Sequence, residues 1–340
     1  MTHIVAIGTA VPESTYRQQE IHHLLYPGQG EASSRAGMIF ARSAIATRHS
    51  VLADPAFLLG NPGTEARNRV YVEEAHALAA RAIRRCLKQA GLGPEAVDLL
   101  VVVSCTGVET PGLDLTLAAA LGMHQDMRRT CILGMGCYAA FPGLQRAQDF
   151  VAAHPGKRAL VVCVELCTLH LQADESDENL VATALFGDGA AAALVGAGPG
   201  PAIVDTCTLT AYDTAEHMSF KLTDHGFKMH LSSYVPKILE ANVEGLLDRL
   251  LAPHGLTHAD IAQWAIHPGG RKILDHVQAR LGLTDAQVAA SRRVLKEHGN
   301  MSSPTVLFVL DELQPEPGEW GVMMAFGPGL TLEAALLRWA

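Results

Sequence analysis

Two stretches of the chain carry the same order of structural signals, and this repeat constrains the fold more than any other feature. In the first stretch, Asp98 precedes an apolar strand, and Cys137 lies 39 positions after Asp98, where a helix begins. In the second, Asp260 precedes a strand, and Asn300 follows 40 positions after it where another helix opens. The repeat predicts one supersecondary plan used twice, with Cys137 and Asn300 at equivalent positions near a pseudo-twofold axis.

The predicted strands are runs of consecutive apolar residues, which are typical of a sheet covered by helices on both faces. We predict strands over residues 4–7, 99–103, 159–164, 190–195, 264–266 and 321–326. Helical periodicity predicts helices over residues 72–90, 143–153, 235–251, 273–281 and 305–313. Residues 17–63 are less periodic and predict helical pieces and loops that cover the core. Together these patterns predict a layered α/β fold.

Length and turn residues suggest where the two halves meet. A chain of 340 residues is long enough for about two core units at ~150 residues each. Gly and Pro cluster over residues 196–201, as they do in linkers. We therefore predict an N-terminal half over residues 1–196 that carries Cys137, and a C-terminal half over residues 197–340 that carries His267 and Asn300.

Composition and charge exclude several classes of protein. Apolar residues make up 49% of the chain and charged residues 18%, which supports a large core and excludes a disordered chain. The formal net charge of −9 argues against binding nucleic acid. The longest uncharged stretches, residues 130–145 and 189–204, are broken by Gly and Pro and are too short for a membrane span. Without a basic leader segment or a disulfide framework among the seven cysteines, we expect a reduced, cytoplasmic protein.

Cys137 is the candidate nucleophile. It lies in GMGCYAAF, residues 134–141, where a glycine turn leads into a helix. Unsatisfied N–H groups and the helix dipole at such a position favour a thiolate over a thiol. The alternative is a small buried cysteine that only packs in the core.

His267 and Asn300 are the candidate partners of this nucleophile. His267 follows the strand over residues 264–266, and ligand-binding groups in α/β sheets lie at such carboxyl ends. Asn300 precedes a helix, where it could equally be an N-cap, a duty that Ser302 and Ser303 could share. A thiol, an imidazole and an amide together suit an acyl thioester and a carbonyl that develops enolate character.

Two other kinds of site compete with this interpretation. Residues 134–139 fit the dinucleotide pattern G-x-G-x-x-A, and Glu165 ends the next strand. However, Glu165 follows Gly136 by 29 positions, and a dinucleotide site leaves the histidine and the asparagine unexplained. Cys163 and Cys167 lack the paired spacing and the histidines of a zinc site, so we predict no metal.

Five sequence blocks resemble the type III polyketide synthases, the chalcone synthase-like enzymes. The blocks are GMGCYAAFPGL (134–144), ALFGDGAAA (184–192), WAIHPGGRKILD (264–275), GNMSSPTVLFVLDE (299–312) and WGVMMAFGPGLTLE (320–333). They occur in the family's order and cover nearly the whole chain. The resemblance implies a thiolase-like fold with two pseudo-equivalent halves in αβαβα layers. It also implies a homodimer that needs no cofactor beyond its CoA thioester substrates.

The resemblance assigns roles to the three candidate catalytic residues. Cys137 would be the nucleophile that carries the starter and the growing chain. His267 and Asn300 would polarise the thioester carbonyl of malonyl-CoA and stabilise the enolate that forms as carbon dioxide leaves. His267, as an imidazolium, would also hold Cys137 as a thiolate.

The resemblance also implies residues at the mouth of a substrate cavity. Phe186 matches a phenylalanine between the CoA tunnel and the cavity. Met229 stands where the family has a second gating phenylalanine, which implies a more adaptable rim and disfavours aromatic starters. Thr110 matches a residue that crosses the dimer interface into the partner's cavity.

Further binding residues follow from the same match. Glu165, Cys167 and Thr168 fall in the stretch that lines the cavity in this family. Ser302, next to the catalytic asparagine, is expected to contact substrate. Arg42 is the best match for the basic residues that hold the CoA phosphates.

We therefore predict a type III polyketide synthase that joins an acyl-CoA starter to malonyl-CoA units and releases a pyrone, resorcinol or phloroglucinol-type product. The stretch CVELCTLHLQ (163–172) resembles bacterial members and favours a fatty acyl starter. A ketoacyl-ACP synthase III-like enzyme is the nearest alternative, although it typically has His-Gln-Ala-Asn where this chain has His-Pro-Gly-Gly. An NAD(P)-dependent dehydrogenase and a non-catalytic thiolase-fold binding protein are alternatives from other classes.

Overall fold

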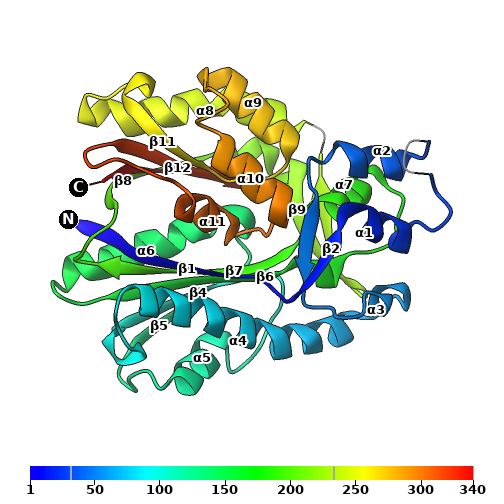
Figure 1. The fold of residues 1–340 in the computed structure, drawn as a ribbon, viewed down its shortest axis with the longest axis horizontal. Coiled ribbons are helices and arrows are strands. Elements are labelled where there is room, and N and C mark those ends of the chain that lie inside the picture. The colour runs from blue at the N-terminus through cyan, green and yellow to red at the C-terminus, as the bar shows by residue number, and fades with distance from the viewer. Residues whose placement is uncertain (31–32, 233, 340) are drawn as a thin grey trace.

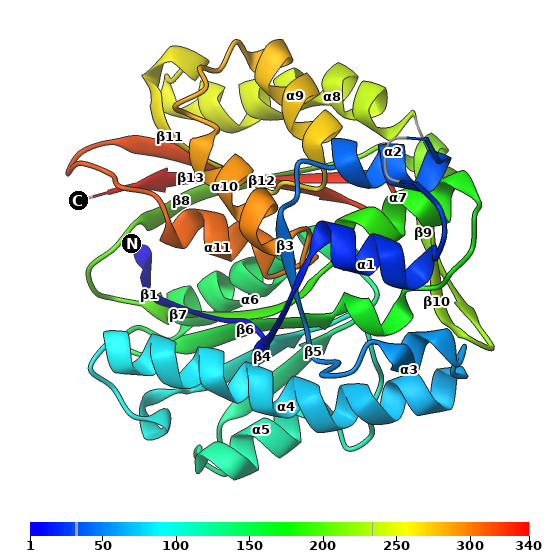
Figure 2. The same cartoon turned by 45° about the vertical axis from the view of Figure 1, so that its right-hand side comes forward.

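Helices and sheets alternate in five layers in the computed structural model, which describes residues 1–30, 33–232 and 234–339 (Figure 1). The outer layers are α4 (Thr64–Gln89) with α5 (Leu113–Leu121), and α8 (Val235–Leu251) with α9 (Arg271–Leu281). The central layer holds α6 (Ala140–Ala153) and α11 (Thr305–Asp311), with one half of the sheet on each side. Figure 2 shows the same order after a 45° turn.

The N-terminal half of the sheet has the strand order β5-β4-β6-β7-β1. Its strands are β1 (Thr2–Ala10), β4 (Leu99–Val103), β5 (Arg128–Ile132), β6 (Ala159–Leu166) and β7 (Asp188–Gly196). Strand β4 is parallel to β5 and β6, whereas β7 is antiparallel to β6 and β1. Every residue of β4, β6 and β7 is buried, which explains their continuous apolar sequences.

The C-terminal half repeats this arrangement with the order β11-β12-β13-β8. Its strands are β8 (Ala202–Thr210), β11 (Ile261–Ile266), β12 (Trp320–Gly327) and β13 (Thr331–Arg338). The pairs run parallel, antiparallel and antiparallel, as they do along β4-β6-β7-β1. Strands β1 and β8 pair antiparallel where the two halves meet. The predicted fold of two pseudo-equivalent αβαβα halves is confirmed.

Apolar side chains form separate cores between successive layers. Adjacent strand residues point to opposite faces of the sheet, so each strand supplies two cores. Leu100 packs into the core against α4, and Val101 packs into the central core around α6 and α11. In the other half, Met323 faces the central core and Met324 faces the core beneath α8 and α9. The central core therefore joins both halves and fixes how they face each other.

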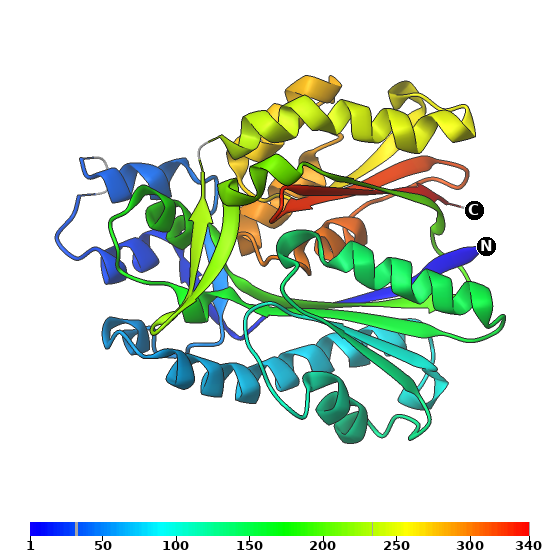
Figure 3. The ribbon, with the colours of Figure 1, turned by 180° about the vertical axis from the view of Figure 1, so that it is seen from behind.

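Shorter elements cover the end of the molecule where the two halves open. They are β2 (Ser14–Arg17), α1 (Gln18–Leu25), α2 (Arg35–Arg42), β3 (Thr47–Ser50), α3 (Ala56–Leu59), α7 (Asp177–Leu185), β9 (Met218–Thr223), β10 (Gly226–Leu231) and α10 (Ala289–His298). In the view from behind, the β9–β10 hairpin reaches from the second half toward the first (Figure 3). At its tip, Thr64 N donates to Asp224 O over 2.8 Å.

The predicted strands and helices are all present, with some different ends and several additions. Helix α4 begins at residue 64, eight residues before the predicted start, because its first turns are polar. Strand β5 is not among the buried apolar runs predicted above, because it is an edge strand with exposed and half-buried residues only. Strands β8 and β13 were missed, and residues 17–63 contain the β2–β3 hairpin as well as the expected helical pieces.

Candidate active site

Cys137 lies in a single turn of 3₁₀ helix, residues 136–138, immediately before α6. Its side chain is buried, with only 4% of the residue exposed, and it belongs to the same core as Phe186 and Met229. The backbone of Gly136 has a left-handed φ of +73°, and a Cβ there would lie 2.8 Å from Pro328 Cδ. Only glycine meets both requirements, so Gly136 fixes the turn that presents the Cys137 thiol.

Asn300 comes from the other half and is held on both sides of its backbone. Asn300 N donates to Leu185 O over 2.9 Å, and Gly187 N donates to Asn300 O over 3.0 Å, which forms an isolated parallel bridge with Phe186. The side-chain amide Nδ2 lies 4.0 Å from Cys137 Sγ. Asn300 is not the N-cap of α11, which is Pro304, and its amide donor faces the candidate nucleophile.

The Asn300 amide is oriented by two further contacts. Its Nδ2 donates to Gly269 O over 3.2 Å, and its Oδ1 accepts from Ser302 N over 2.8 Å. Ser302 adopts a left-handed φ of +60°, an uncommon conformation for a non-glycine residue. These contacts fix which edge of the amide points toward the thiol.

His267 directly follows the end of β11. Its backbone N–H donates to Met324 O over 2.8 Å and continues the ladder with β12. A Cβ on Gly269 would lie 3.7 Å from His267 Nε2, so the imidazole and the Asn300 amide approach the same glycine. His267 is fully buried, and neither ring nitrogen has a hydrogen-bond partner among the described residues. A buried imidazole with two free positions is suited to a bound substrate.

Burial favours the neutral forms of both groups. It raises the pKa of the Cys137 thiol to about 11, and the nearby Glu165 carboxylate acts in the same direction. Hydrogen bonds with Ser302 and Asn300 act in the opposite direction. Burial also lowers the pKa of His267 to about 3. Burial therefore opposes the expected thiolate–imidazolium pair, whereas the hydrogen bonds with Ser302 and Asn300 favour the thiolate.

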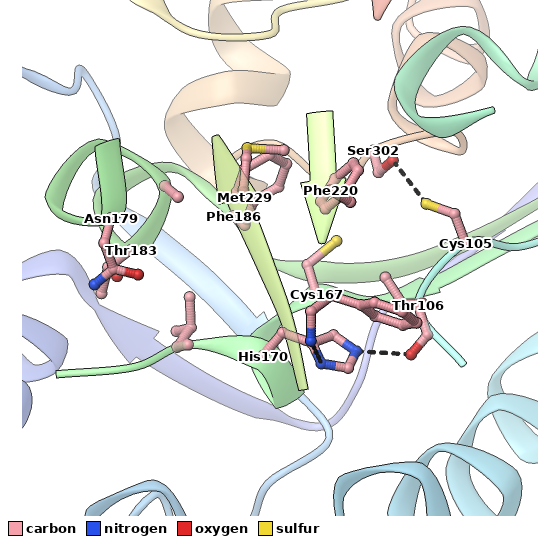
Figure 4. Close-up of a pocket in the computed structure, with 13 residues that line it drawn as sticks. Cys105, Thr106, Cys167, His170, Asn179, Thr183, Phe186, Phe220, Met229 and Ser302 are labelled. Carbon is pink, nitrogen blue, oxygen red and sulfur yellow. Dashed lines mark hydrogen bonds between the residues drawn. The ribbon is translucent and has the colours of Figure 1, made fainter. Parts of the chain in front are cut away.

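A cavity of about 40 Å³ lies where α7, the β9–β10 hairpin and the loop after β4 converge (Figure 4), and its wall includes Ser302, whose side chain hydrogen-bonds with Cys137. The residues that line it are Cys105, Thr106, Cys167, His170, Leu171, Asn179, Ala182, Thr183, Phe186, Phe220, Phe227, Met229 and Ser302. Cys105 Sγ lies 3.9 Å from Ser302 Oγ, so residues from both halves meet in its wall.

Four of the residues predicted to bind substrate line this cavity. They are Phe186, Cys167, Met229 and Ser302. Phe186 and Met229 are both largely buried. Met229 pairs with Phe220 across the hairpin, so an aromatic ring lies opposite the methionine.

Glu165 and Thr168 lie behind the wall rather than in it. The buried Glu165 accepts from Ser303 Oγ over 2.7 Å and Thr106 Oγ1 over 2.9 Å, and burial raises its pKa. Thr168 Oγ1 donates to Asp188 Oδ2 over 2.6 Å. Both side chains are engaged in buried networks that support the neighbouring lining residues.

Thr110 and Arg42 lie on the surface. Thr110 is exposed in the loop between β4 and α5, and Arg42 is exposed at the end of α2. Neither lines the cavity within one chain. Their predicted roles concern a second subunit and the CoA phosphates, so both roles stay predictions.

Several lining residues were not predicted from the sequence, and His170 is the most rigid of them. His170 Nε2 donates to Thr106 O over 2.8 Å, and its Nδ1 accepts from Phe227 N over 3.2 Å. Burial lowers the pKa of His170 to about 4, so the ring is neutral. Its position directly after Glu165–Thr168 was the available signal. Cys105 and Phe220 gave no such signal.

Comparison with known proteins decides what this site belongs to. The models of the chalcone and stilbene synthases match residues 1–199 with their N-terminal domain and residues 203–340 with their C-terminal domain. The chain belongs to the chalcone and stilbene synthase family of type III polyketide synthases. The family assignment supports none of the alternatives: dehydrogenase, carrier-protein-dependent synthase or binding protein.

The relatives of this polyketide synthase include bacterial enzymes of similar length. It is 37% identical to a 1,3,6,8-tetrahydroxynaphthalene synthase of Streptomyces peucetius subsp. caesius, over 99% of this chain and 93% of that one. It is 35% identical to a 3,5-dihydroxyphenylacetyl-CoA synthase of Streptomyces toyocaensis, over 99% of this chain and 90% of that one.

Solved structures of the family share its fold. PKS-I from the brown alga Ectocarpus siliculosus has a TM-score of 0.94 and 32% identity, covering 100% of this chain and 98% of its own. The 1,3,6,8-tetrahydroxynaphthalene synthase of Streptomyces coelicolor A3(2) has a TM-score of 0.92 and 31% identity, covering 98% of each chain.

Among the described residues, no helix combines the length and apolar character that crossing a membrane requires. In the same part of the chain, no three His, Cys, Asp or Glu side chains are grouped to hold a metal ion.

Proposed function

We propose that Cys137, His267 and Asn300 form the condensing centre of this polyketide synthase. The observation that carries the proposal is the 4.0 Å approach of Asn300 Nδ2 to Cys137 Sγ, beside an imidazole with two unpartnered nitrogens. The buried position of all three side chains excludes water, which strengthens hydrogen bonds to developing charge.

The loading step uses the cysteine and the histidine. As the starter thioester binds, His267 accepts the proton of Cys137, and the resulting sulfur anion attacks the thioester carbonyl. The bond from that carbonyl to the sulfur of CoA breaks, and CoA leaves as the thiol after taking the proton from His267, which becomes neutral again. Burial lowers the pKa of His267, so the imidazole is neutral, which is the protonation state that a base requires.

The extension step uses the histidine and the asparagine. The bond between the carboxylate and the α-carbon of malonyl-CoA breaks, and its electron pair forms an enolate while carbon dioxide leaves. N–H groups of His267 and Asn300 donate to the enolate oxygen. The enolate carbon then attacks the acyl group on Cys137, the sulfur leaves, and a β-ketoacyl-CoA forms that can be reloaded.

The cavity favours a short starter, such as acetyl- or malonyl-CoA, over the fatty acyl starter predicted from the sequence. Its volume is about 40 Å³, and the His170 ring in its wall is hydrogen-bonded at both nitrogens. Phe220 and Phe227 fill further space along the hairpin. The relatives named above make polyhydroxylated aromatic compounds, and we propose a product of this class.

A starter panel tests the substrate proposal. The purified enzyme is given malonyl-CoA alone, or with acetyl-, hexanoyl- or dodecanoyl-CoA, and its products are identified by mass spectrometry. We expect aromatic products from malonyl-CoA alone or with acetyl-CoA, and little from dodecanoyl-CoA. Alkylated pyrones or resorcinols that form fastest with dodecanoyl-CoA would refute the short starter.

We also propose that the enzyme is a homodimer that joins near β5. This edge strand has no further strand beside it among the described residues, and Leu133 and Val108 next to it are each 58% exposed. Exposed apolar groups at an open sheet edge are typical of an interface. Thr110 lies on the same loop as Val108, as expected of a residue that reaches a partner. Analytical sedimentation tests the proposed dimer. We expect the wild-type protein to sediment as a dimer and the Leu133→Asp variant to sediment as a monomer.

The remaining assignments are also proposals. We place the division between the two halves at residues 196 and 197, within the linker that separates β7 from β8. We assign Arg42 to the CoA phosphates, and we expect no cofactor besides the thioester substrates. The cytoplasmic location stays a prediction.

A further inference from the structure

Arg48 is a buried cation that makes no ion pair among the described residues, although the Asp188 carboxylate acts on it at longer range and raises its pKa. It lies in β3, and its residue exposure is 0%. No acidic side chain among the described residues lies within ion-pair distance, and its Nε and Nη2 have no hydrogen-bond partner there. Burying an arginine in this state is costly, so its retention in the fold calls for a reason.

The hydrogen bonds of Arg48 identify what it holds. Its Nη1 donates to Thr183 O over 2.6 Å and to Phe186 O over 2.8 Å. Thr183 lies in the last turn of α7, where carbonyl groups lack partners within the helix and where positive charge is favoured. Arg48 therefore fixes the chain as it leaves α7 and enters the bridge between Phe186 and Asn300.

Two glycines make room for the arginine at this bridge. A Cβ on Gly299 would lie 3.0 Å from Arg48 Cδ, and a Cβ on Gly187 would lie 3.5 Å from Arg48 Cβ. Gly187 directly follows Phe186, and Gly299 directly precedes Asn300. Phe186 and Asn300 are the two residues of the bridge. The side chain of Arg48 thus packs under both chain segments that meet at the active site.

We propose that Arg48 is a positioning residue that aligns the Asn300 amide, and with it the Phe186 ring, by fixing the backbone bridge between them. The inference rests on the proposed function, in which Asn300 stabilises the enolate. Arg48 itself touches neither substrate nor the reacting atoms. Its loss lets the bridge shift, and small displacements of a donor lower a catalysed rate by about 10-fold or more.

The test measures malonyl-CoA decarboxylation by Arg48→Met, which keeps the stem and removes the donors. We expect kcat per folded molecule to fall about 10-fold or more, with a nearly unchanged KM. The matched control is Arg67→Met. Arg67 is also fully buried, and it donates to Pro62 O over 2.9 Å and to Leu171 O over 3.2 Å, away from the bridge. This control should lose stability but keep its decarboxylation rate per folded molecule.

A double-mutant cycle shows whether Arg48 acts through Asn300. If it does, Arg48→Met combined with Asn300→Ala is no slower than Asn300→Ala alone. The proposal would be overturned if the losses of kcat in the two single variants multiply in the double variant. A wild-type kcat in Arg48→Met would also overturn it. If Asn300→Ala alone leaves decarboxylation unchanged, the proposed function fails first, which separates the two failures.

A milder variant covers the case in which Arg48→Met does not fold. Arg48→Lys keeps the charge, but its shorter side chain lacks the planar fork of donors. We expect a folded enzyme with an intermediate loss of kcat and the same non-additivity with Asn300→Ala. An Arg48→Lys enzyme with full kcat would contradict the need for the two carbonyl contacts.

Discussion

Asn300 Nδ2 lies 4.0 Å from Cys137 Sγ, although the two residues come from equivalent positions in opposite halves of a duplicated fold. Each follows a glycine with a left-handed backbone, Gly136 or Gly299, and each precedes a helix of the central layer. The duplication therefore delivers two different side chains to one point, one suited to nucleophilic attack and the other to hydrogen-bond donation.

Cys137→Ala should abolish condensation and leave malonyl-CoA decarboxylation in place. The substitution removes the acyl carrier but leaves His267 and Asn300 to stabilise the enolate. Both products, polyketide and acetyl-CoA, are measured in one chromatographic assay. Cys207→Ala is the matched control, since Cys207 lies in β8 outside the cavity. Polyketide formation by Cys137→Ala at the wild-type rate would disprove its role as nucleophile.

Asn300→Ala should slow decarboxylation by about 100-fold, the loss typical when one donor to an oxyanion is removed. Release of carbon dioxide from labelled malonyl-CoA measures the effect. Asn242→Ala serves as the control, because Asn242 Nδ2 bonds to Ile238 O within α8, on the far side of the second sheet. An unchanged decarboxylation rate in Asn300→Ala would show that the role of Asn300 is structural only.

Alkylation of Cys137 by iodoacetamide should accelerate with pH in the empty enzyme. Burial raises the pKa of this thiol to about 11, so the reactive thiolate is a small fraction at pH 7 and increases about tenfold per pH unit up to that pKa. The pKa of His267, lowered to about 3, keeps the imidazole neutral over this range. Labelling is followed by peptide mass spectrometry.

Two serine variants sharpen the pH test. Ser302→Ala should slow the alkylation of Cys137 further, because the hydrogen bond with Ser302 lowers the pKa of the thiol. Ser303→Ala is the comparison, since its hydroxyl bonds to Glu165 instead. A rate of wild-type labelling that already levels off below pH 8 would show that a thiolate–imidazolium pair exists before substrate binds.

Gly136→Ala should inactivate the enzyme, whereas Gly134→Ala should only destabilise it. Both glycines have left-handed φ, +73° and +74°, so either alanine costs roughly 1–2 kcal/mol in backbone strain. Only at position 136 does the new Cβ meet the Pro328 ring; at position 134 there is open space. Melting temperature and condensation rate are measured for both. Equal activity in the two variants would show that the Cys137 turn tolerates displacement.

The layered fold was predictable because its strands are buried on both faces. Runs such as residues 99–103 and 159–164 are apolar without interruption, which only a covered sheet explains. The edge strand β5 lacks this signal, since its residues Arg128 and Arg129 are polar and exposed. Strand pairing there depends on β4, which sequence periodicity does not show.

The positions of Cys137, His267 and Asn300 were predictable, but the state of the site was not. Their local signals, a glycine turn, a strand end and a helix start, are properties of short segments. The pKa of the thiol depends on residues distant in sequence, among them Glu165, whose charge raises it, and Ser302, whose hydrogen bond lowers it. The position of His170 in the cavity wall likewise depends on distant residues, because its ring hydrogen-bonds to the backbone of Thr106 and Phe227 in other elements.

The most direct test of the account is to map the growing chain on the protein. The enzyme is incubated with labelled malonyl-CoA, quenched in acid, digested and analysed by peptide mass spectrometry. The account predicts acyl adducts on the peptide that contains Cys137, in a series that differs by two-carbon ketide units. Label found instead on the peptides of Cys105 or Cys167, with none on that of Cys137, would contradict it.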